Sequence, residues 1–484
     1  MLSRRTFLSS LAAVPMLRAQ QPHLNFVFIL IDDMGWRDVS YNGSETFETP
    51  HIDKLASEGM KFTNAYAACP VCSPTRASIM TGKYPARLGI TNFLPGKHNL
   101  PHSKLIAPLS KQQLPLEEVT IAEALKPAGY RTAAIGKWHL GGPDFFPEKQ
   151  GFDVNFAGTQ AGSPKSYFYP QWEPNPPITA KPGAYLPDRL TDATIDFMTQ
   201  NRDHPFMVYL AHYSVHIPLE AKEDMIERYR KRIKPGALQN NPIYAAMVAS
   251  VDESVERIVK ALDDLKLADH TAIVFMSDNG GLASAEYKGQ TPTSNKPLKA
   301  GKGFLYEGGI REPMFIKWPG VVKPGSQCDV PVISTDFYPT LLDMAGIKND
   351  PGNPADGVSI VPLLKQAGIP KQDALFWHYP HYSNQGGRPG AAMRQGDYKI
   401  IEWYETGSVE LYNLRDDIGE DHNLAVKLPE KARQMKARLD AWLKELNPEM
   451  PKPNPDYDKA NETQGLQPAI REQLRTGVLP TPSS

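Results

Sequence analysis

The sequence contains little cysteine and almost no net charge, and both shortages narrow the range of possible functions. Only 3 cysteines occur in 484 residues, a small and odd number that argues against a disulfide framework. The formal net charge is -1 and no basic block is present, which disfavours a nucleic-acid partner. The length and the 41% apolar content are instead typical of a globular enzyme with one large domain and a smaller one.

The N-terminal segment lacks an apolar run long enough to span a bilayer. Arg4 and Arg5 precede an apolar stretch that ends at Leu17, which is too short for a transmembrane helix. We therefore expect residues 1–20 to be an export signal that resembles the twin-arginine type. The protein is then expected to be periplasmic or secreted, with no stable membrane insertion. The alternative is an ordinary flexible N-terminus.

Continuous apolar runs alternate with helical patterns in the following part of the chain. The first run covers residues 24–31, and similar runs occur at 131–135, 206–211, 272–276 and 314–318. Such runs predict strands buried on both faces, as in a parallel sheet. Between them lie helical patterns such as the apolar stripe from Val251 to Leu265. The alternation predicts an α/β domain over residues 21–350, with a large, mostly parallel central sheet sandwiched by helices.

The pattern changes after about residue 350. Short strands separated by turns are predicted at 374–379, 398–403 and 409–412, followed by a helix whose apolar face runs from Ala432 to Leu446. These features predict a smaller C-terminal α+β subdomain with an antiparallel sheet over residues 351–447. Residues 448–484 are rich in Pro, Asn and Gln, so we expect an extended or disordered tail.

Cys72 opens a segment with unusual local chemistry, Cys-Ser-Pro-Thr-Arg-Ala-Ser-Ile-Met-Thr-Gly. Pro74 suits the first turn of a helix, so Cys72 is expected at a helix N-terminus with Arg76 one turn above it. Free N–H groups, the positive helix end and a guanidinium then converge near one side chain. Such a pocket suits a doubly charged tetrahedral anion.

The same cysteine also belongs to a Cys-x-x-Cys pattern with Cys69, which is typical of redox or zinc sites. A structural zinc site needs four ligands, and Cys328 is the one remaining cysteine. A thioredoxin-like role would require a small domain around the pair, which the chain does not show. We therefore favour the anion pocket.

Acidic residues follow two of the predicted strands. Asp32 and Asp33 come after the first strand, and Asp278 and Asn279 come shortly after the run at 272–276. Ligands of open α/β sheets gather beyond the carboxyl ends of the strands, so both pairs are expected to face one crevice. Three carboxylates and an amide oxygen are hard ligands that suit Ca²⁺ or Mg²⁺. The alternative is turn chemistry, since Asp-Asn-Gly favours tight turns.

A third segment, Gly-Lys-Trp-His, follows the strand at 131–135 and contains Lys137 and His139. In an extended backbone, side chains two positions apart lie on the same side. The Lys137 ammonium and the His139 imidazole are therefore expected to point in the same direction. A histidine can move a proton near neutral pH. Standing alone, the pair would equally fit a surface lysine and a core histidine.

Together these segments resemble the type I, formylglycine-dependent sulfatases of the alkaline-phosphatase-like superfamily. Residues 72–82 are similar to the family's modification signature, and residues 129–141 to its second signature. The family's histidine two residues before a proline selects His216 over His212. Its segment with another active-site lysine is similar to residues 295–313 and selects Lys302 over Lys299, because glycines flank Lys302. The resemblance covers residues from about 25 to 425 in five motifs.

The resemblance implies an arylsulfatase-like enzyme that hydrolyses a sulfate ester, on a sulfated sugar or another alcohol. It implies that a maturation enzyme oxidises Cys72 to Cα-formylglycine and that one Ca²⁺ ion is bound. The implied metal ligands are Asp32, Asp33, Asp278, Asn279 and the formylglycine oxygen of Cys72. The implied catalytic residues are Cys72, Arg76, Lys137, His139, His216 and Lys302. In the family scheme the lysines neutralise the sulfuryl oxygens, Arg76 steadies the formylglycine hydrate, His216 protonates the leaving alcohol and His139 accepts the proton that releases sulfate.

Two other functions remain open at this stage. One is a formylglycine-dependent phosphodiesterase or phosphonate hydrolase, and the other is a non-catalytic relative that binds sulfated glycans. The identity of the sugar, the position of its sulfate and the choice between exo and endo action are also open. We expect specificity to lie in the loops at 90–105, 161–187 and 378–394. Aromatic and basic residues there are candidates for sugar binding: Tyr167, Trp172, His378, His381 and Arg388.

Overall fold

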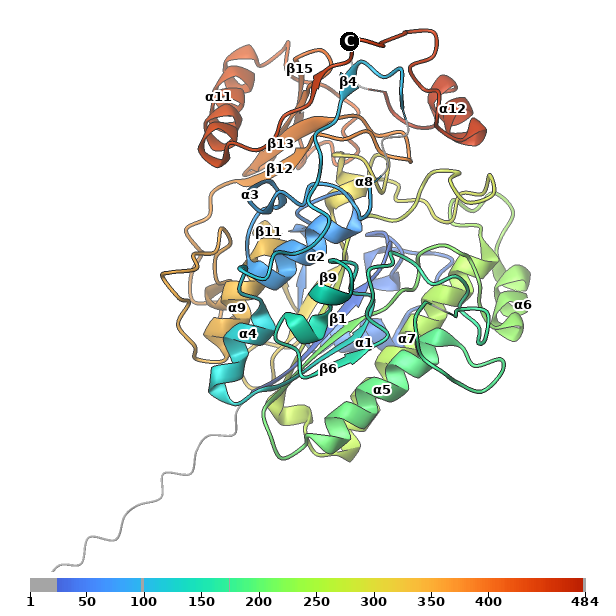
Figure 1. Cartoon of the computed structure of the whole chain (residues 1–484), viewed down its shortest axis with the longest axis vertical. Helices are drawn as coiled ribbons and strands as arrows, with labels where there is room; N and C mark the ends of the chain where they lie inside the picture. Colours follow the sequence, from blue (N-terminus) through green and yellow to red (C-terminus); the bar gives the residue numbers. More distant parts are fainter. Residues whose placement is uncertain (1–23, 97–99, 174, 482–484) are drawn as a thin grey trace, which may run out of the picture.

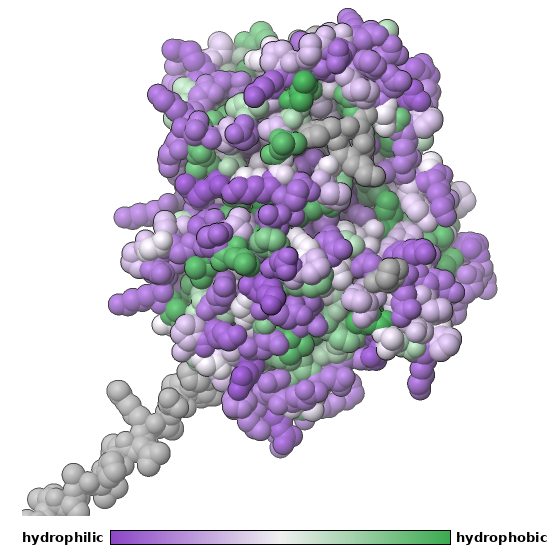
Figure 2. Space-filling view, in the orientation of Figure 1, coloured by the Kyte–Doolittle hydropathy of each residue, from purple (hydrophilic) through white to green (hydrophobic). Residues whose placement is uncertain are grey.

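The computed structural model describes residues 24–96, 100–173 and 175–481 (Figure 1). The expected export signal at residues 1–20 lies outside the described residues. Within these ranges no helix is both long and apolar enough to cross a membrane. On the face shown in Figure 2, hydrophobic residues lie scattered among hydrophilic ones.

A central eight-stranded sheet is built in the order β10-β2-β9-β8-β1-β7-β5-β6. In chain order its strands are β1 (Asn25–Ile31), β2 (Met60–Phe62), β5 (Arg131–Gly136), β6 (Val154–Phe156), β7 (Phe206–Ala211), β8 (Thr271–Ser277), β9 (Met314–Lys317) and β10 (Ser326–Cys328). The three central strands β8, β1 and β7 run parallel and are buried along their whole length. β9 is antiparallel to both of its neighbours, so the sheet is mostly parallel, as predicted.

Helices cover both faces of this sheet. Alternate side chains of β1 enter two different cores, Val27 and Ile29 on one side and Phe26 and Phe28 on the other. The first core includes residues of α1 (Pro50–Ser57), α5 (Leu186–Gln200), α6 (Glu223–Arg232) and α7 (Pro242–Asp264). The second includes residues of α2 (Cys72–Thr81), α3 (Pro85–Leu88), α4 (Ile121–Leu125), α9 (Phe337–Met344) and α10 (Val361–Leu364). The predicted layered α/β fold is confirmed.

A separate antiparallel sheet follows in the C-terminal part, with strands β12 (Leu375–Tyr379), β13 (Gly390–Gln395), β14 (Tyr398–Trp403) and β15 (Ser408–Asn413) in sequential order. Helix α11 (Pro429–Leu446) packs on it through a third core. β13 was not predicted, because Gly-Ala-Ala-Met-Arg-Gln lacks the β-branched and aromatic residues typical of strands. It forms a strand because both of its edges are paired. The remaining short elements are β3 (Ala65–Tyr66), β4 (Leu105–Ile106), α8 (Glu307–Ile310) and β11 (Val332–Ile333).

The segment after Asn447 differs from the extended or disordered tail that its composition predicts. It contains the strand β16 (Lys452–Pro453), which pairs with β4, and the helix α12 (Pro468–Arg475). Ile470 is fully buried and Leu474, one turn later, packs against the C-terminal core. Two apolar side chains on one helix face are enough to dock the segment, although its overall composition is polar.

A buried charge network joins the small antiparallel sheet to helix α8. Lys399 of β14 lies between two carboxylates, with its Nζ 3.0 Å from Glu307 Oε1 and 2.9 Å from Glu420 Oε1, and all three side chains are fully buried. Burial by itself would raise the pKa of Glu307, but Lys399 and Arg311 outweigh it and lower that pKa to about 2. Burial raises the pKa of Glu420 to about 7, against the charge of Lys399. Lys399 therefore neutralises carboxylates from outside its own sheet.

Replacing Lys399 with methionine should destabilise the protein strongly. The substitution keeps the volume but removes the cation that pairs with Glu420 and leaves Glu307 with Arg311. Breaking a buried ion pair in this way typically costs about 3–5 kcal/mol. Urea denaturation of wild type and Lys399→Met measures the difference. The matched control is Lys260→Met, which removes an exposed pair with Asp264 and should change little. Equal effects of the two substitutions would contradict the role assigned to the network.

Candidate active site

The floor of the site is formed where three parallel strands end. β7, β1 and β8 are neighbours, so the residues that follow them meet at one edge of the sheet. Asp32 and Asp33 follow β1, and Asp278 and Asn279 follow β8, each with at most 1% of its surface exposed. The backbone N–H of Asp33 donates to Asp278 Oδ1 at 3.3 Å, and Asn279 Nδ2 donates to Asp33 Oδ1 at 2.7 Å. The two acidic segments predicted to share a crevice are therefore in direct contact.

Helix α2 begins at Cys72 and points its N-terminus at this floor. Cys72 is buried, and Arg76, one turn later, is fully buried. Arg76 donates from Nε to Asp278 Oδ2 at 2.8 Å and from one terminal nitrogen to the carbonyl oxygen of Lys137 at 2.8 Å. A guanidinium held at two points in this way fixes the start of α2 against the ends of β5 and β8.

Lys137 and His139 lie just beyond β5 and face the same floor. Lys137 Nζ donates to Asp32 Oδ2 at 2.7 Å, and His139 Nδ1 lies 3.4 Å from Cys72 Sγ. His139 Nε2 contacts the carbonyl oxygen of Leu94, so this nitrogen donates and Nδ1 is left as the acceptor that faces Cys72. Burial, followed by the charge of Lys137, holds the pKa of His139 well below its usual range. His139 is thus a neutral imidazole with its basic nitrogen directed at residue 72.

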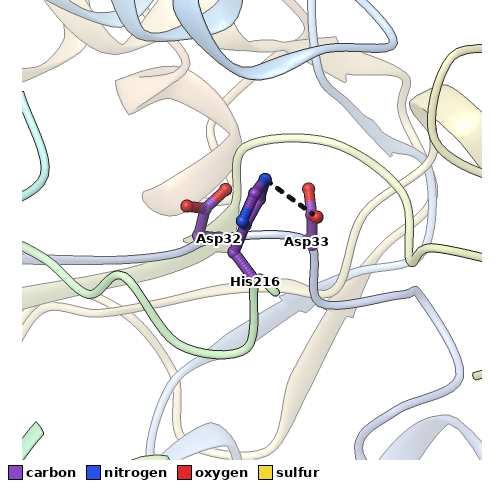
Figure 3. A group of neighbouring side chains, drawn as sticks. All are labelled: Asp32, Asp33 and His216. Carbon is purple, nitrogen blue, oxygen red and sulfur yellow. Dashed lines mark ion pairs between the residues drawn. The ribbon is translucent and has the colours of Figure 1, made fainter. Parts of the chain in front are cut away.

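Lys302 and His216 complete the group on the side of Asp33. Lys302 Nζ lies 2.8 Å from Asp33 Oδ1, and His216 Nε2 lies 3.6 Å from Asp33 Oδ2 (Figure 3). His216 Nδ1 donates to the carbonyl oxygen of Ile217 at 2.7 Å, which leaves Nε2 toward the site.

The two residues that the sequence motifs left as alternatives lie in other contacts. His212 is fully buried and its Nε2 lies 3.0 Å from Ser254 Oγ, while Lys299 Nζ donates to the carbonyl oxygen of Glu420 at 2.8 Å. The structure therefore brings His216 and Lys302 to the floor of the site.

The pKa values of the buried carboxylates are shifted in opposite directions. Burial raises the pKa of Asp32 to about 8, in spite of the ion pair with Lys137 and with the help of the charge on Asp278. Burial would also raise the pKa of Asp33, but Lys302 and His216 outweigh it and lower that pKa to about 2. The pKa of the Cys72 thiol is raised by burial, against the charge of Lys137. The shared burial thus raises the pKa of Asp32, whereas the nearby cations hold the pKa of Asp33 low.

The donor set at the floor fits a divalent cation. Asp32 Oδ1 and Asn279 Oδ1 are buried oxygens with no hydrogen-bond partner among the described residues. Atoms of Asp32, Asp33 and His216 that could coordinate a metal lie within 4.8 Å of one another (Figure 3). Carboxylate and amide oxygens are the ligands that Ca²⁺ and Mg²⁺ prefer. The unpaired oxygens are therefore the strongest indication of a metal site here.

A cavity of about 170 Å³ opens above the floor. Four of the predicted site residues line it, namely Cys72, His139, His216 and Lys302. The three loops expected to carry specificity also contribute, through Phe93 and Leu94, Gly162, and Asn384 and Gln385. Ile217 and Glu286 complete the lining. No motif in the sequence singled out Glu286 or Gln385.

The five residues proposed from the sequence as sugar contacts do not line this cavity: Tyr167, Trp172, His378, His381 and Arg388. Tyr167 donates its hydroxyl to the carbonyl oxygen of Tyr213 at 2.6 Å, and Trp172 donates Nε1 to that of Ile178 at 2.8 Å. These two side chains stabilise their loop from within, whereas His381 and Arg388 line two other cavities.

Two family models match the chain. Residues 24–347 match the model described as Sulfatase, and residues 300–449 match the model described as N-sulphoglucosamine sulphohydrolase, C-terminal. Human N-acetylgalactosamine-6-sulfatase is 34% identical, over 83% of this chain and 75% of that protein. A sulfatase of Formosa agariphila is 32% identical, over 87% of this chain and 88% of that protein. Human arylsulfatase A is 29% identical, over 95% and 94% of the two chains.

Solved structures also resemble this chain. The crystal structure of Ps i-CgsB superposes with a TM-score of 0.75 at 30% identity and covers 95% of this chain and 100% of that chain. The same protein has been solved in complex with k-i-k-neocarrahexaose, with a TM-score of 0.73. A phosphonate monoester hydrolase of Agrobacterium radiobacter matches with a TM-score of 0.63 at 21% identity, which shows a common fold alone.

Gly162 is predicted to be essential for the placement of His139. A Cβ at this position would lie 2.5 Å from His139 Cε1, closer than side-chain atoms approach. Gly162→Ala should therefore displace the imidazole and lower kcat for nitrophenyl sulfate by about 100-fold, as expected for a misplacement of about 1 Å within an active site. The matched control is Gly142→Ala, since a Cβ there meets nothing within 4 Å. Full activity of Gly162→Ala would show that His139 needs no such close contact.

Proposed function

The chain belongs to the sulfatase family and is a sulfuric ester hydrolase, and from this premise we propose that it releases sulfate from a sulfated carbohydrate with a formylglycine made from Cys72 and one bound calcium ion. The observation that carries the proposal is the position of Cys72, whose Sγ lies 3.4 Å from a neutral His139 and lines the cavity with Lys302 and His216. A sugar substrate is supported by relatives named for N-acetylgalactosamine 6-sulfate hydrolysis and by the structure solved with k-i-k-neocarrahexaose.

Residue 72 is the proposed nucleophile. The Sγ atom of Cys72 stands in for an oxygen of the formylglycine hydrate, which would supply a hydroxyl for attack on sulfur and a second hydroxyl for later release of sulfate. His139 Nδ1 faces this atom and is placed to accept the proton of the second hydroxyl. Arg76 is fixed one turn along α2 and stabilises negative charge at the start of the helix.

Binding of the sulfuryl group is assigned to Lys137 and Lys302. Their ammonium groups approach the acidic floor from β5 and from the segment after β8, and pair with Asp32 and Asp33 respectively. Two cations held in a buried site stabilise charge on the sulfuryl oxygens more strongly than they would in water. His216 presents Nε2 toward the cavity, although burial lowers its pKa to about 3. In its protonated form it would give the Nε2 proton to the departing alcohol oxygen and keep the Nδ1 proton on the carbonyl oxygen of Ile217.

The calcium ion would be held by Asp32, Asp33, Asp278, Asn279 and the oxygen of residue 72. Bound there, it would act as a Lewis acid that polarises a sulfuryl oxygen. The raised pKa of Asp32 supports the assignment, because a cation would replace the proton that burial otherwise favours on this carboxylate.

Export and domain organisation complete the proposal. We infer that the protein is periplasmic or secreted, that the twin-arginine-like segment at residues 1–20 directs it there, and that a maturation enzyme oxidises Cys72 beforehand. Residues 21–350 would form the catalytic domain and residues 351–447 the C-terminal subdomain. The cavity residues Asn384 and Gln385 suggest that the subdomain also takes part in substrate binding.

In an active preparation residue 72 should be formylglycine. A thiol ester of sulfate has no second hydroxyl through which sulfate can be expelled, so unmodified Cys72 should not turn over. Mass spectrometry of the tryptic peptide that contains residue 72 measures the modification, and Cys72→Ala should lose activity while keeping its thermal stability. Cys69→Ala is the control, since Cys69 is buried but does not line the cavity. Full turnover by a sample that contains only unmodified cysteine would refute the assignment.

Metal analysis should find about one calcium per chain, as expected for a single cluster of oxygen ligands. Calcium that binds only the folded protein stabilises it, by about 2.7 kcal/mol at 100 times its dissociation constant. Chelation should therefore lower Tm and sulfate ester hydrolysis together, and added Ca²⁺ should restore both. Asp278→Asn should remove the Tm response, whereas Asp203→Asn, at an exposed surface position, should keep it. Zinc bound at Cys69 and Cys72 would overturn this site.

A further inference from the structure

We propose that Glu286, together with Gln385, is the group that selects the substrate: it binds free hydroxyls of the sugar beside the sulfate ester and excludes a second anionic group at that place. The inference rests on the proposed function, because it assigns a role on the leaving-group side of the same cavity. Neither the sulfatase motifs nor the metal cluster include these two residues.

Glu286 and Gln385 come from different parts of the chain and meet at the wall of the cavity. Glu286 lies in the segment after β8, and Gln385 lies in the loop between β12 and β13. Gln385 Nε2 donates a hydrogen bond to Glu286 Oε2, and both residues line the cavity with Lys302. Gln385 is only 4% exposed, and its Oε1 has no hydrogen-bond partner in the part of the chain that the structure describes. A buried amide oxygen in this position needs a donor, which a ligand hydroxyl can supply.

The charge of Glu286 is not neutralised within the site. Each buried cation of the floor already faces a carboxylate: Arg76 with Asp278 at 2.7 Å, Lys137 with Asp32 at 2.7 Å, and Lys302 with Asp33 at 2.8 Å. Among the described residues Glu286 forms no ion pair within 4.0 Å with a basic side chain, and its hydrogen bonds come from the neutral amides of Gln385 and Asn384. Lys302 acts on it only over a longer distance, and burial raises the pKa of Glu286. An assay pH of about 8 favours the ionised form of Glu286 over the protonated form that burial promotes, and the ionised form presents a negative charge to the ligand.

The cavity wall formed by Glu286 and Gln385 is suited to bind one kind of sugar alcohol. A carboxylate accepts hydrogen bonds from hydroxyls, and the free amide oxygen of Gln385 accepts another. On the remaining sides Phe93, Leu94 and Ile217 provide apolar surface for the C–H face of a ring. A second sulfate or a carboxylate on the sugar would bring a further negative charge close to the Glu286 carboxylate, which is unfavourable. The expected substrate is therefore a sugar with free hydroxyls next to a single sulfate ester.

The test compares a matched pair of sugars as competitors of nitrophenyl sulfate hydrolysis at pH 8: N-acetylgalactosamine 6-sulfate and its 4,6-disulfate. Wild type should bind the monosulfate at least 10-fold more tightly than the disulfate. Glu286→Gln keeps the shape and the bond with Gln385 but removes the charge, so the two inhibition constants should approach within about 3-fold, as the loss of one charge–charge repulsion predicts. Glu117→Gln, an exposed carboxylate outside the cavity, should leave the wild-type preference unchanged.

The inference is overturned if wild type binds the disulfate as tightly as the monosulfate, or if Glu286→Gln shifts both constants by the same factor. The circular dichroism spectrum and Tm of the variant exclude a general loss of structure. Failure of the proposed function is recognised separately, because wild type would then release no sulfate from nitrophenyl sulfate. In that case calorimetric titration of the same two sugars into wild type and Glu286→Gln reads the preference directly, with the same two outcomes.

Discussion

The structure depends on the need to neutralise three carboxylates that are buried together at one edge of the central sheet. Asp32, Asp33 and Asp278 have at most 1% exposed surface, so water cannot screen them from one another. Each is paired with a cation delivered by a different element: Arg76 by α2, Lys137 by the end of β5, and Lys302 by the segment after β8. Removing one partner of a buried pair leaves an uncompensated charge, so these elements can pack only as a set. The placement of α2 and of the loops follows from this requirement.

Two residues of the active site have backbone conformations that the surrounding packing must stabilise. Asp33 has φ 61° and His139 has φ 59°, values in the left-handed region that side chains other than glycine seldom adopt. Both residues stand immediately beyond buried parallel strands, which hold the backbone on either side. The sheet thus supports two unfavourable conformations, which place Asp33 beside Lys302 and His139 beside Cys72. The intrinsic backbone preferences of aspartate and histidine would not produce these conformations.

The sequence predicted those parts of the molecule whose structure is determined by residues close together in the chain. β7 was predicted at its observed bounds because it is buried on both faces and reads as an unbroken apolar run. The acidic pairs and Lys137 could be placed because strand ends and motif spacing are visible in one segment. β13 and α12 were missed, since partner strands and a docking surface stabilise them and their own composition does not. Glu286 and Gln385 were missed for the same reason: they are 99 residues apart and become neighbours only in the folded chain.

The glycine beside Lys302 has a consequence for the order of events in the cell. Gly303 donates its N–H to the carbonyl oxygen of Pro70, two residues before Cys72, at 2.8 Å, and a Cβ on it would lie 2.5 Å from Ser383 Oγ. The backbone at this point is thus clasped between the start of α2 and the loop after β12. A ribosome delivers residue 72 long before residue 383, so the clasp cannot close until most of the chain has emerged. Cys72, which is buried in the folded protein, therefore lacks this cover until late in synthesis.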